Sequence, residues 1–454
     1  MAIWDQRTFV PAAISAMYLR REWIALNEDV AHTIEAIRAV DPDCDFQQVS
    51  ASEDDRFWTI ALYGPTRPAD YYLVDREAAA LRHLFTARPG LKPYRLAATA
   101  PAVVKSRDSL DLVSYVTLPA DESSPRPRAP LPTVLLVHGG PWGRDGYGYD
   151  REWQWLANRG YAVLNVNYRA SAGFGKAFVN AGDGEHARKI HEDLIDAVEW
   201  AIREGIADRD RVTIMGASYG GYAAFVGATF TPGVFACAVP IVGITDLVTL
   251  IESAPPYWTD FLEHFYRRYG DPRTEEGRAL LRSRSPLYRA DAITKPMLIA
   301  HGANEVRCTL AQSDAIVAAM QRHSLPVTYV VFPDEGHGFA TPENRLAYYA
   351  IAEQFLARFL GGRAEPIGSE VSESSAEIRA GGDIITQPPK RPRSDLLTSR
   401  RCLLVGGAMN LLWIAALTLL VAMEKIAPKG DILAKALGAL MIGVGAARLI
   451  WQPS

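Results

Sequence analysis

A serine at position 218 is flanked by glycines in a pattern that suits nucleophilic catalysis. Gly216 and Gly220 bracket Ser218 in a Gly-x-Ser-x-Gly motif. Such a serine lies on a tight turn between a strand and a helix, and its neighbours must lack bulk because the two backbones pass close by. The β-branched run before the motif and the apolar, alanine-rich run after it predict that strand and that helix. The motif also recurs by chance, so a catalytic role requires partners elsewhere in the chain.

His337 is the predicted base for this serine. A serine hydroxyl is a weak nucleophile at neutral pH, so it requires a base, a group that orients the base and donors for the oxyanion. In hydrolases with this motif the acid and then the histidine follow the serine, each on a loop after a later strand. Apolar runs at residues 236–242, 296–300 and 327–332 predict such strands, and His337 lies between two glycines after the last one. The alternative is an ordinary surface-loop histidine.

Glu305 is the predicted orienting acid. It follows the strand predicted at residues 296–300, on the loop where a carboxylate that orients the histidine belongs. Glutamate is one methylene longer than aspartate, so the loop must retreat slightly for the carboxylate to meet the imidazole. Asp334 and Asp314 are the nearest other acids in the sequence and remain alternatives.

Backbone donors for the oxyanion are predicted at Tyr219 and Gly140. The residue after the nucleophile, here Tyr219, supplies one N–H group, and a loop after an early strand supplies the other. A strand predicted at residues 133–137 leads into His-Gly-Gly-Pro, whose glycines let bare backbone approach a substrate carbonyl. Paired glycines also occur in ordinary turns. Because the chain also contains the serine motif, we interpret Gly140 as a functional residue.

Six stretches of the chain together resemble the prolyl oligopeptidase family of serine peptidases, particularly its bacterial acylaminoacyl-peptidase-like members. The resemblance implies an α/β-hydrolase domain with a mostly parallel sheet at residues 101–363. It also implies cleavage of short peptides through an acyl-enzyme, with no metal or organic cofactor. The stretches are HGGPWGRD (138–145), NYRASAGFG (167–175), RVTIMGASYGGY (211–222), GDPRTEE (270–276), PMLIAHGANEVR (296–307) and FPDEGHGFATPE (332–343).

The resemblance carries the roles of nucleophile, base and oxyanion donors onto the residues predicted above. Two positions depart from the family pattern: Glu305 stands where the acid is normally aspartate, and Ala170 where glycine is usual. Arg307, two residues after the acid, looks like a family position that can contact bound substrate. An esterase acting on small acyl esters and a catalytically silent, membrane-tethered fragment are the alternatives to a peptidase.

Residues 1–100 look like a remnant of the β-propeller that family members place ahead of the hydrolase domain. Propeller blades normally cover one another, so a lone blade exposes faces and edges. We therefore expect an N-terminally truncated family member with a more open active site, unless another chain supplies the missing blades. Strands are predicted at residues 13–19, 22–26, 46–50, 57–63, 71–75 and 79–85, and a helix at residues 28–40.

The composition changes beyond residue 363. Residues 364–400 are polar and rich in serine, proline and charge, which predicts a disordered linker. Within residues 401–454, apolar runs at 402–423 and 432–451 predict a transmembrane helical hairpin, because about 20 apolar residues cross a bilayer. Basic residues before the first run predict that the catalytic domain faces the cytoplasm at the cell membrane. Residues 406–429 resemble the end of a family of predicted metal-binding integral membrane proteins, but no metal ligands are visible and no metal is inferred.

Composition sets further limits. A chain of 454 residues can hold a large α/β domain with appendages, and a formal net charge of −4 gives no sign of nucleic-acid binding. The four cysteines have neither metal-site nor disulfide spacing, which favours reduced cytoplasmic thiols. The N-terminus lacks the pattern of a signal peptide. The sequence leaves the residue preferred at the scissile bond open, and a homo-oligomer is neither predicted nor excluded.

Overall fold

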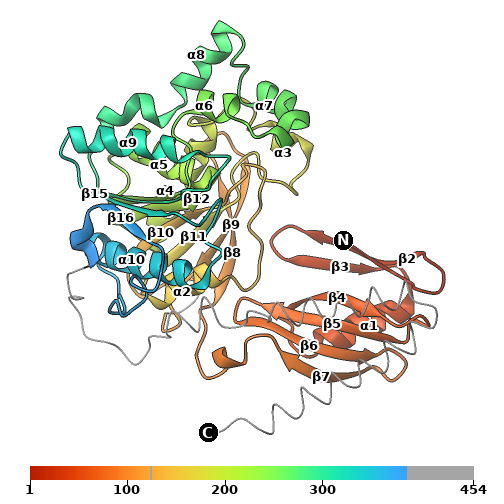
Figure 1. Cartoon of the computed structure of the whole chain (residues 1–454). Coiled ribbons are helices and arrows are strands. Elements are labelled where there is room, and N and C mark those ends of the chain that lie inside the picture. Colours follow the sequence, from red (N-terminus) through yellow and green to blue (C-terminus); the bar gives the residue numbers. More distant parts are fainter. Residues whose placement is uncertain (123–124, 386–454) are drawn as a thin grey trace, which may run out of the picture. The chain divides into compact units, whose positions relative to one another are not determined.

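A nine-stranded sheet organises the larger part of the computed structural model, which describes residues 1–122 and 125–385 (Figure 1). Its order is β16-β15-β14-β13-β12-β10-β11-β9-β8. Pairs among β10 to β15 are parallel, and pairs that involve β8, β9 or β16 are antiparallel. The predicted α/β-hydrolase class with a mostly parallel sheet is confirmed. The strands are β8 (Thr99–Lys105), β9 (Asp111–Thr117), β10 (Leu131–Val137), β11 (Ala162–Val166), β12 (Ala207–Ala217), β13 (Cys237–Ile241), β14 (Met297–Gly302), β15 (Val327–Phe332) and β16 (Glu377–Ala380).

The central strands are apolar because helices cover both faces of the sheet. Every residue of β13 and β15 is buried, as expected for parallel strands between two helical layers. Two helices, α2 (Arg151–Asn158) and α10 (Pro342–Leu360), cover one face (Figure 1). The other face is covered by α4 (Lys189–Arg203), α5 (Tyr219–Phe230) and α9 (Leu310–Arg322).

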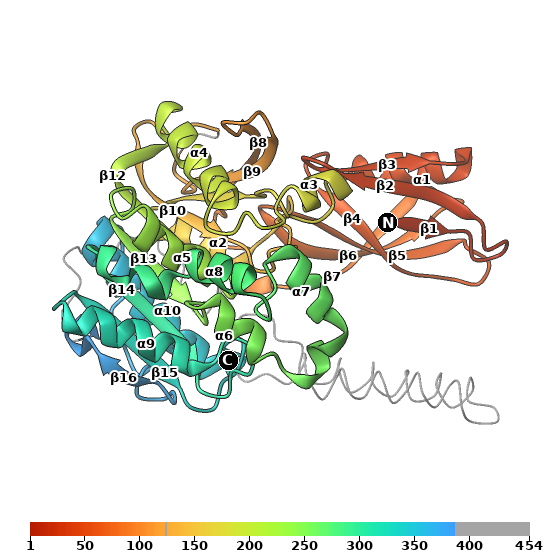
Figure 2. The ribbon, with the colours of Figure 1, turned by 90° about the horizontal axis from the view of Figure 1, so that it is seen from above.

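A long insertion between β13 and β14 carries additional helices, green in Figures 1 and 2. It follows a strand that ends beside the serine turn, so its helices can contribute to the walls of a site there. They are α6 (Leu247–Glu252), α7 (Leu262–Arg268) and α8 (Glu275–Ser283), with the 3-10 helices η2 (Pro256–Phe261) and η3 (Pro286–Ala292). A short helix before α4, α3 (Lys176–Asn180), belongs to a different loop.

The N-terminal residues form two smaller antiparallel sheets and one helix. The side chain of Asn27 accepts a hydrogen bond from the N–H of Val30 at 2.9 Å, which caps α1 (Glu28–Arg38). The helix packs on a core that includes Trp23 and Trp58. The strands predicted between residues 13 and 85 are present, whereas β1 was not predicted. The sheets comprise β1 (Ala2–Trp4), β2 (Pro11–Met17) and β3 (Arg21–Ala25), and β4 (Asp45–Ala51), β5 (Phe57–Gly64), β6 (Arg67–Asp75) and β7 (Ala80–Thr86).

Three side chains of the hydrolase domain bind backbone carbonyls of the N-terminal residues. The Tyr115 hydroxyl donates to the carbonyl oxygen of Leu19 at 3.0 Å. Nη2 of Arg144 donates to the carbonyl oxygens of Met17 and Tyr18, both at 2.9 Å. Nε2 of Gln154 donates to the carbonyl oxygen of Pro65 at 3.0 Å. A backbone carbonyl accepts such a bond whichever side chain its residue carries, so these contacts depend on the position of the backbone.

The disordered linker predicted at residues 364–400 is wrong for part of its length. β16 pairs antiparallel with β15, and the 3-10 helix η4 (Gly382–Ile385) follows it. The pairing satisfies backbone groups at what would otherwise be the free edge of β15, which local composition does not reveal. The remaining linker and the hairpin predicted at residues 401–454 lie outside the described residues. Within residues 1–122 and 125–385, no helix has both the length and the apolar character required to cross a membrane.

Candidate active site

Ser218 lies on a sharp turn between β12 and α5. The strand ends one residue before it and the helix begins one residue after it, and Ser218 has φ 59° and ψ −116°. This backbone conformation is costly for a residue other than glycine. A Cβ on Gly216 would lie 2.5 Å from the carbonyl oxygen of Val137, and one on Gly220 would lie 2.1 Å from it. The end of β10, at Val137, lies too close to this turn for a side chain at either glycine.

A cavity of about 450 Å³ brings together four of the residues predicted from the sequence. Ser218, His337, Arg307 and Gly140 line it, and they come from loops after four different strands. The carboxyl ends of parallel strands meet at one edge of a sheet, where α/β proteins place their ligands. The other lining residues are Gly139, Trp142, Ile244, Leu250, Trp258, Phe261, Phe265, Tyr269 and Cys308.

The Glu305 carboxylate holds the His337 ring. Its Oε2 accepts a hydrogen bond from Nδ1 of His337, and its Oε1 accepts from the backbone N–H groups of Arg307 and, at 3.2 Å, Cys308. Burial raises the pKa of the Glu305 carboxyl, but these hydrogen bonds outweigh burial and lower the pKa below its usual value. Glu305 is therefore ionised at neutral pH. Because Nδ1 donates to Glu305, the neutral imidazole has Nε2 available to accept a proton.

The two alternative acids are engaged elsewhere. Asp334 accepts hydrogen bonds from Ser375 and Asn344, and Asp314 accepts from the Tyr329 hydroxyl at 2.7 Å. Of the three carboxylates considered from the sequence, Glu305 is the one that the structure pairs with the histidine.

Ser218 and His337 share the cavity without a hydrogen bond between them in the described part of the chain. In ligand-free enzymes the contact between nucleophile and base is often long, and it tightens when substrate binds. The structure places Ser218 and His337 at one site because both line the same cavity.

The predicted oxyanion donors lie next to the nucleophile. Tyr219 is the first residue of α5, so its N–H group is one of those that have no partner within the helix. The positive end of the helix also favours an anion at this place. The loop that carries Gly140 passes close to the serine, since a Cβ on Gly139 would lie 3.6 Å from Cβ of Ser218. Both loops can therefore present bare backbone to a substrate carbonyl.

Sequence reasoning missed one wall of the cavity. Trp142, Trp258, Phe265 and Tyr269 form this aromatic wall, with ring centroids 5.1 Å apart for Trp258 and Phe265 and 5.3 Å for Phe265 and Tyr269. The signal was the recurrence of large apolar residues at helical spacing between residues 258 and 269. A wall of this kind suits a large apolar side chain.

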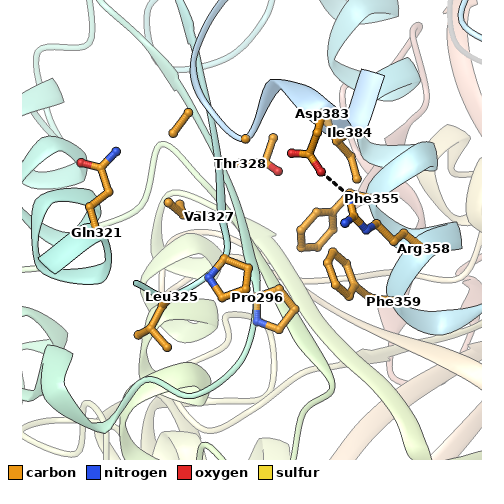
Figure 3. Close-up of a pocket in the computed structure, with 13 residues that line it drawn as sticks. Pro296, Gln321, Leu325, Val327, Thr328, Phe355, Arg358, Phe359, Asp383 and Ile384 are labelled. Carbon is orange, nitrogen blue, oxygen red and sulfur yellow. Dashed lines mark hydrogen bonds and ion pairs between the residues drawn. The ribbon is translucent and has the colours of Figure 1, made fainter. Parts of the chain in front are cut away.

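A second cavity, of about 330 Å³, lies at the other end of the sheet (Figure 3). Pro296 and Val327 line it, and they stand where β14 and β15 begin, opposite the edge that carries Ser218. Its main polar feature is the ion pair between Arg358 and Asp383, at 2.7 Å. The lining holds one hydroxyl, that of Thr328, and one carboxylate, that of Asp383, which is already paired with Arg358. Among the residues that the structure describes, the lining holds no serine, cysteine or histidine, so this cavity is not the candidate active site.

Comparisons with known proteins identify related sequences. The prolyl oligopeptidase family model matches residues 147–363. The chain is 52% identical to a dipeptidyl aminopeptidase BIII of Pseudoxanthomonas mexicana, over 84% of this chain and 55% of that protein. It is 40% identical to a dipeptidyl peptidase family member 6 of Caenorhabditis elegans, over 81% of this chain and 52% of that protein. The chain thus spans about half the length of the curated relatives it matches.

A solved structure supports the same relationship. A puromycin-hydrolyzing peptidase of Mycobacterium tuberculosis matches with a TM-score of 0.61 and 28% identity, over 69% of this chain and 47% of that one. A family model described as a copper chaperone matches residues 400–448, which lie outside the described residues. The comparisons give no support to the resemblance of residues 406–429 to an integral membrane protein family.

Proposed function

We propose that this chain is a serine peptidase of the prolyl oligopeptidase family that acts on short peptides, since that family's model matches residues 147–363. The observation that carries the proposal is the pairing of Glu305 with His337 at a cavity that Ser218 also lines. The names of the two curated relatives favour release of dipeptides from the N-terminus as the first activity to test.

The proposed reaction uses these groups in two steps. Oγ of Ser218 attacks the peptide carbonyl carbon while its proton passes to Nε2 of His337, and Glu305 stabilises the imidazolium that results. The N–H groups of Tyr219 and Gly140 bind the oxyanion of the tetrahedral intermediate. His337 then gives its proton to the departing amine, which leaves an acyl-serine. A water molecule then attacks the acyl-serine while His337 again accepts a proton, and the carboxylic acid product leaves as Ser218 regains its proton.

We propose that the aromatic wall receives the side chain of the residue whose carbonyl is attacked. Burying a large apolar side chain against such a wall contributes about 1.5–3 kcal/mol relative to leaving it exposed. Arg307, whose Nε donates to the Tyr257 hydroxyl at 3.3 Å, adds a permanent positive charge to the lining. This guanidinium suits a carbonyl or carboxylate oxygen of the substrate.

Labelling with a fluorophosphonate probe tests the proposal. The folded full-length chain is expected to be labelled at Ser218, and Ser218→Ala to remain unlabelled. Dipeptidyl and N-acyl-amino-acid p-nitroanilides, compared with a p-nitrophenyl ester in the same preparation, distinguish a peptidase from an esterase. A folded chain that takes no label would instead support a catalytically silent fragment.

We also propose two features of the regions outside the hydrolase domain. The first is that residues 1–100 are a propeller remnant. The four-stranded antiparallel sheet formed by β4 to β7 supports it.

The second is that residues 402–423 and 432–451 attach the chain to the cell membrane with the hydrolase domain in the cytoplasm. This proposal rests on the hydropathy of the two segments and on the basic residues before them. Carbonate extraction of membranes and protease protection in spheroplasts test the second; a chain released by carbonate would contradict it.

A further inference from the structure

The loop that joins α3 to α4 fastens the end of α7. The carbonyl oxygen of Arg268, the last residue of α7, accepts a hydrogen bond from the N–H of Gly184 at 2.7 Å. The Arg268 guanidinium binds the side chains of Asp183, in the same loop, and Asn180, the last residue of α3. Phe265 and Tyr269, on either side of Arg268, belong to the aromatic wall. The loop therefore holds the segment that shapes the cavity.

His186 extends this attachment to the oxyanion donor. Its Nε2 lies 3.3 Å from the Arg268 carbonyl oxygen, and its Nδ1 lies 2.9 Å from the Tyr219 hydroxyl. Burial lowers the pKa of His186 to about 3, so the ring is neutral at pH 7. A carbonyl oxygen can only accept, so Nε2 carries the proton and Nδ1 accepts from the Tyr219 hydroxyl. One imidazole thus joins the end of α7 to the start of α5.

The ring also packs directly on the aromatic wall. His186 is stacked on Tyr269 with centroids 3.7 Å apart and an interplanar angle of 15°, and it meets the Tyr219 ring edge-on at 5.6 Å. His186 is 2% exposed and Tyr219 is 1% exposed. A buried hydroxyl that loses its acceptor is costly, so removing the imidazole would displace the Tyr219 side chain.

We propose that His186 is a positioning residue that couples the aromatic wall to the Tyr219 oxyanion donor and thereby sets the preference for a large apolar residue at the scissile bond. The inference rests on the proposed peptidase function. His186 touches neither the substrate nor the reacting atoms. It acts through Tyr269, which shapes the cavity, and through Tyr219, whose N–H binds the oxyanion.

Three variants of the full-length chain test this role. His186→Phe keeps a flat ring against Tyr269 and removes both hydrogen bonds. His186→Gln keeps a donor for the Arg268 carbonyl. His191→Phe is the matched control, because His191 is another buried histidine, with its Nε2 2.8 Å from Oγ1 of Thr231 and outside the cavity lining. Kinetics are measured on the p-nitroanilide series that the wild type hydrolyses best, with phenylalanine or alanine before the scissile bond.

The expected result separates binding from chemistry. In His186→Phe, kcat should fall about tenfold for both substrates, and KM should rise for the phenylalanine substrate alone, so that the preference for phenylalanine declines. His186→Gln should retain more of that preference, and His191→Phe should keep all of it at a comparable melting temperature.

Other outcomes overturn the inference. A His186→Phe variant with the kcat and substrate preference of the wild type would do so, as would an equal loss of preference in His191→Phe. If His186→Phe does not fold, His186→Gln carries the test, because it keeps a donor but lacks the ring that stacks on Tyr269. Partial retention of the preference is expected, and a wild-type kcat with the full wild-type preference would overturn the inference. Failure of the proposed function is distinguishable, because it appears in the wild type as absence of probe labelling and turnover, and both proposals then fall.

Discussion

The two carboxylate oxygens of Glu305 have different partners. Oε1 is fixed by two N–H groups of its own loop, which leaves Oε2 for the His337 ring. These N–H groups hold the carboxylate where Oε2 meets the imidazole. Because the carboxylate is already held in place before substrate binds, the imidazole requires little reorganisation during the reaction.

Replacing Glu305 by glutamine tests this arrangement. The amide keeps the shape but loses the charge that stabilises the imidazolium, so kcat should fall by roughly 10³- to 10⁴-fold. Asp334→Asn is the matched control, since Asp334 lies three residues from His337 and is paired with Ser375 and Asn344. It should keep wild-type turnover. If Glu305→Gln retains turnover while Asp334→Asn loses it, Asp334 is the acid.

The carboxyl group of Asp145 should make the free energy of unfolding depend on pH. Part of the residue remains exposed, but its Oδ2 is out of water and lacks a hydrogen-bond partner among the described residues. Burial, followed by repulsion from Asp150, raises its pKa to about 8. The folded state therefore keeps a proton that the unfolded chain releases near pH 4, so the free energy of unfolding falls as pH rises between about 4 and 8.

Asp145→Asn should remove this loss. The variant should be more stable than the wild type at pH 8, and the difference in free energy of unfolding should shrink toward pH 4, by at most about 1.4 kcal/mol for each pH unit. Denaturant unfolding at several pH values measures the difference. A difference that stays constant with pH would show that Asp145 is ionised in the folded protein.

At the scale of elements, the serine turn depends on how closely β10 approaches the junction of β12 and α5. A Cβ on Gly220 would lie 2.1 Å from the carbonyl oxygen of Val137, so Gly220→Ala must displace either the strand or the helix. We expect a loss of roughly 1–3 kcal/mol in stability together with loss of probe labelling at Ser218. Gly233→Ala is the control, because a Cβ there meets nothing within 4 Å. Comparable labelling of the two variants would mean that the turn tolerates bulk.

The elements near the site could be predicted from the sequence, because each produces a local pattern. β15 occupies the predicted residues 327–332, and the glycines around Ser218 mark the turn that the structure contains. β16 could not be predicted, because only half of its residues are shielded and its pairing with β15 depends on a distant segment. The aromatic wall was missed because the helical spacing between residues 258 and 269 indicates an apolar helix face but not that this face lines the cavity, which depends on how α7 packs.

At the scale of the whole molecule, one loop connects the N-terminal sheets to the chemistry. The loop after β10 carries Gly140 at the cavity and, four residues later, Arg144, which binds the carbonyl oxygens of Met17 and Tyr18. The Arg144 guanidinium also lies 4.0 Å from the ring centroid of Phe174. The N-terminal residues can therefore affect the position of the oxyanion loop, although none of residues 1–100 lines the cavity.

Arg144→Met tests this connection. Methionine keeps much of the apolar stem but donates no hydrogen bond, so the turn between β2 and β3 should open more often, and amide hydrogen exchange in residues 11–25 should rise about tenfold. Exchange in β13 and β15 should not change, and kcat should fall modestly as the oxyanion loop loosens. Arg107→Met is the matched control, since Arg107 pairs with Asp196 within the hydrolase domain. Unchanged exchange in residues 11–25 of Arg144→Met would mean that other contacts hold the N-terminal residues, and that the oxyanion loop does not depend on them.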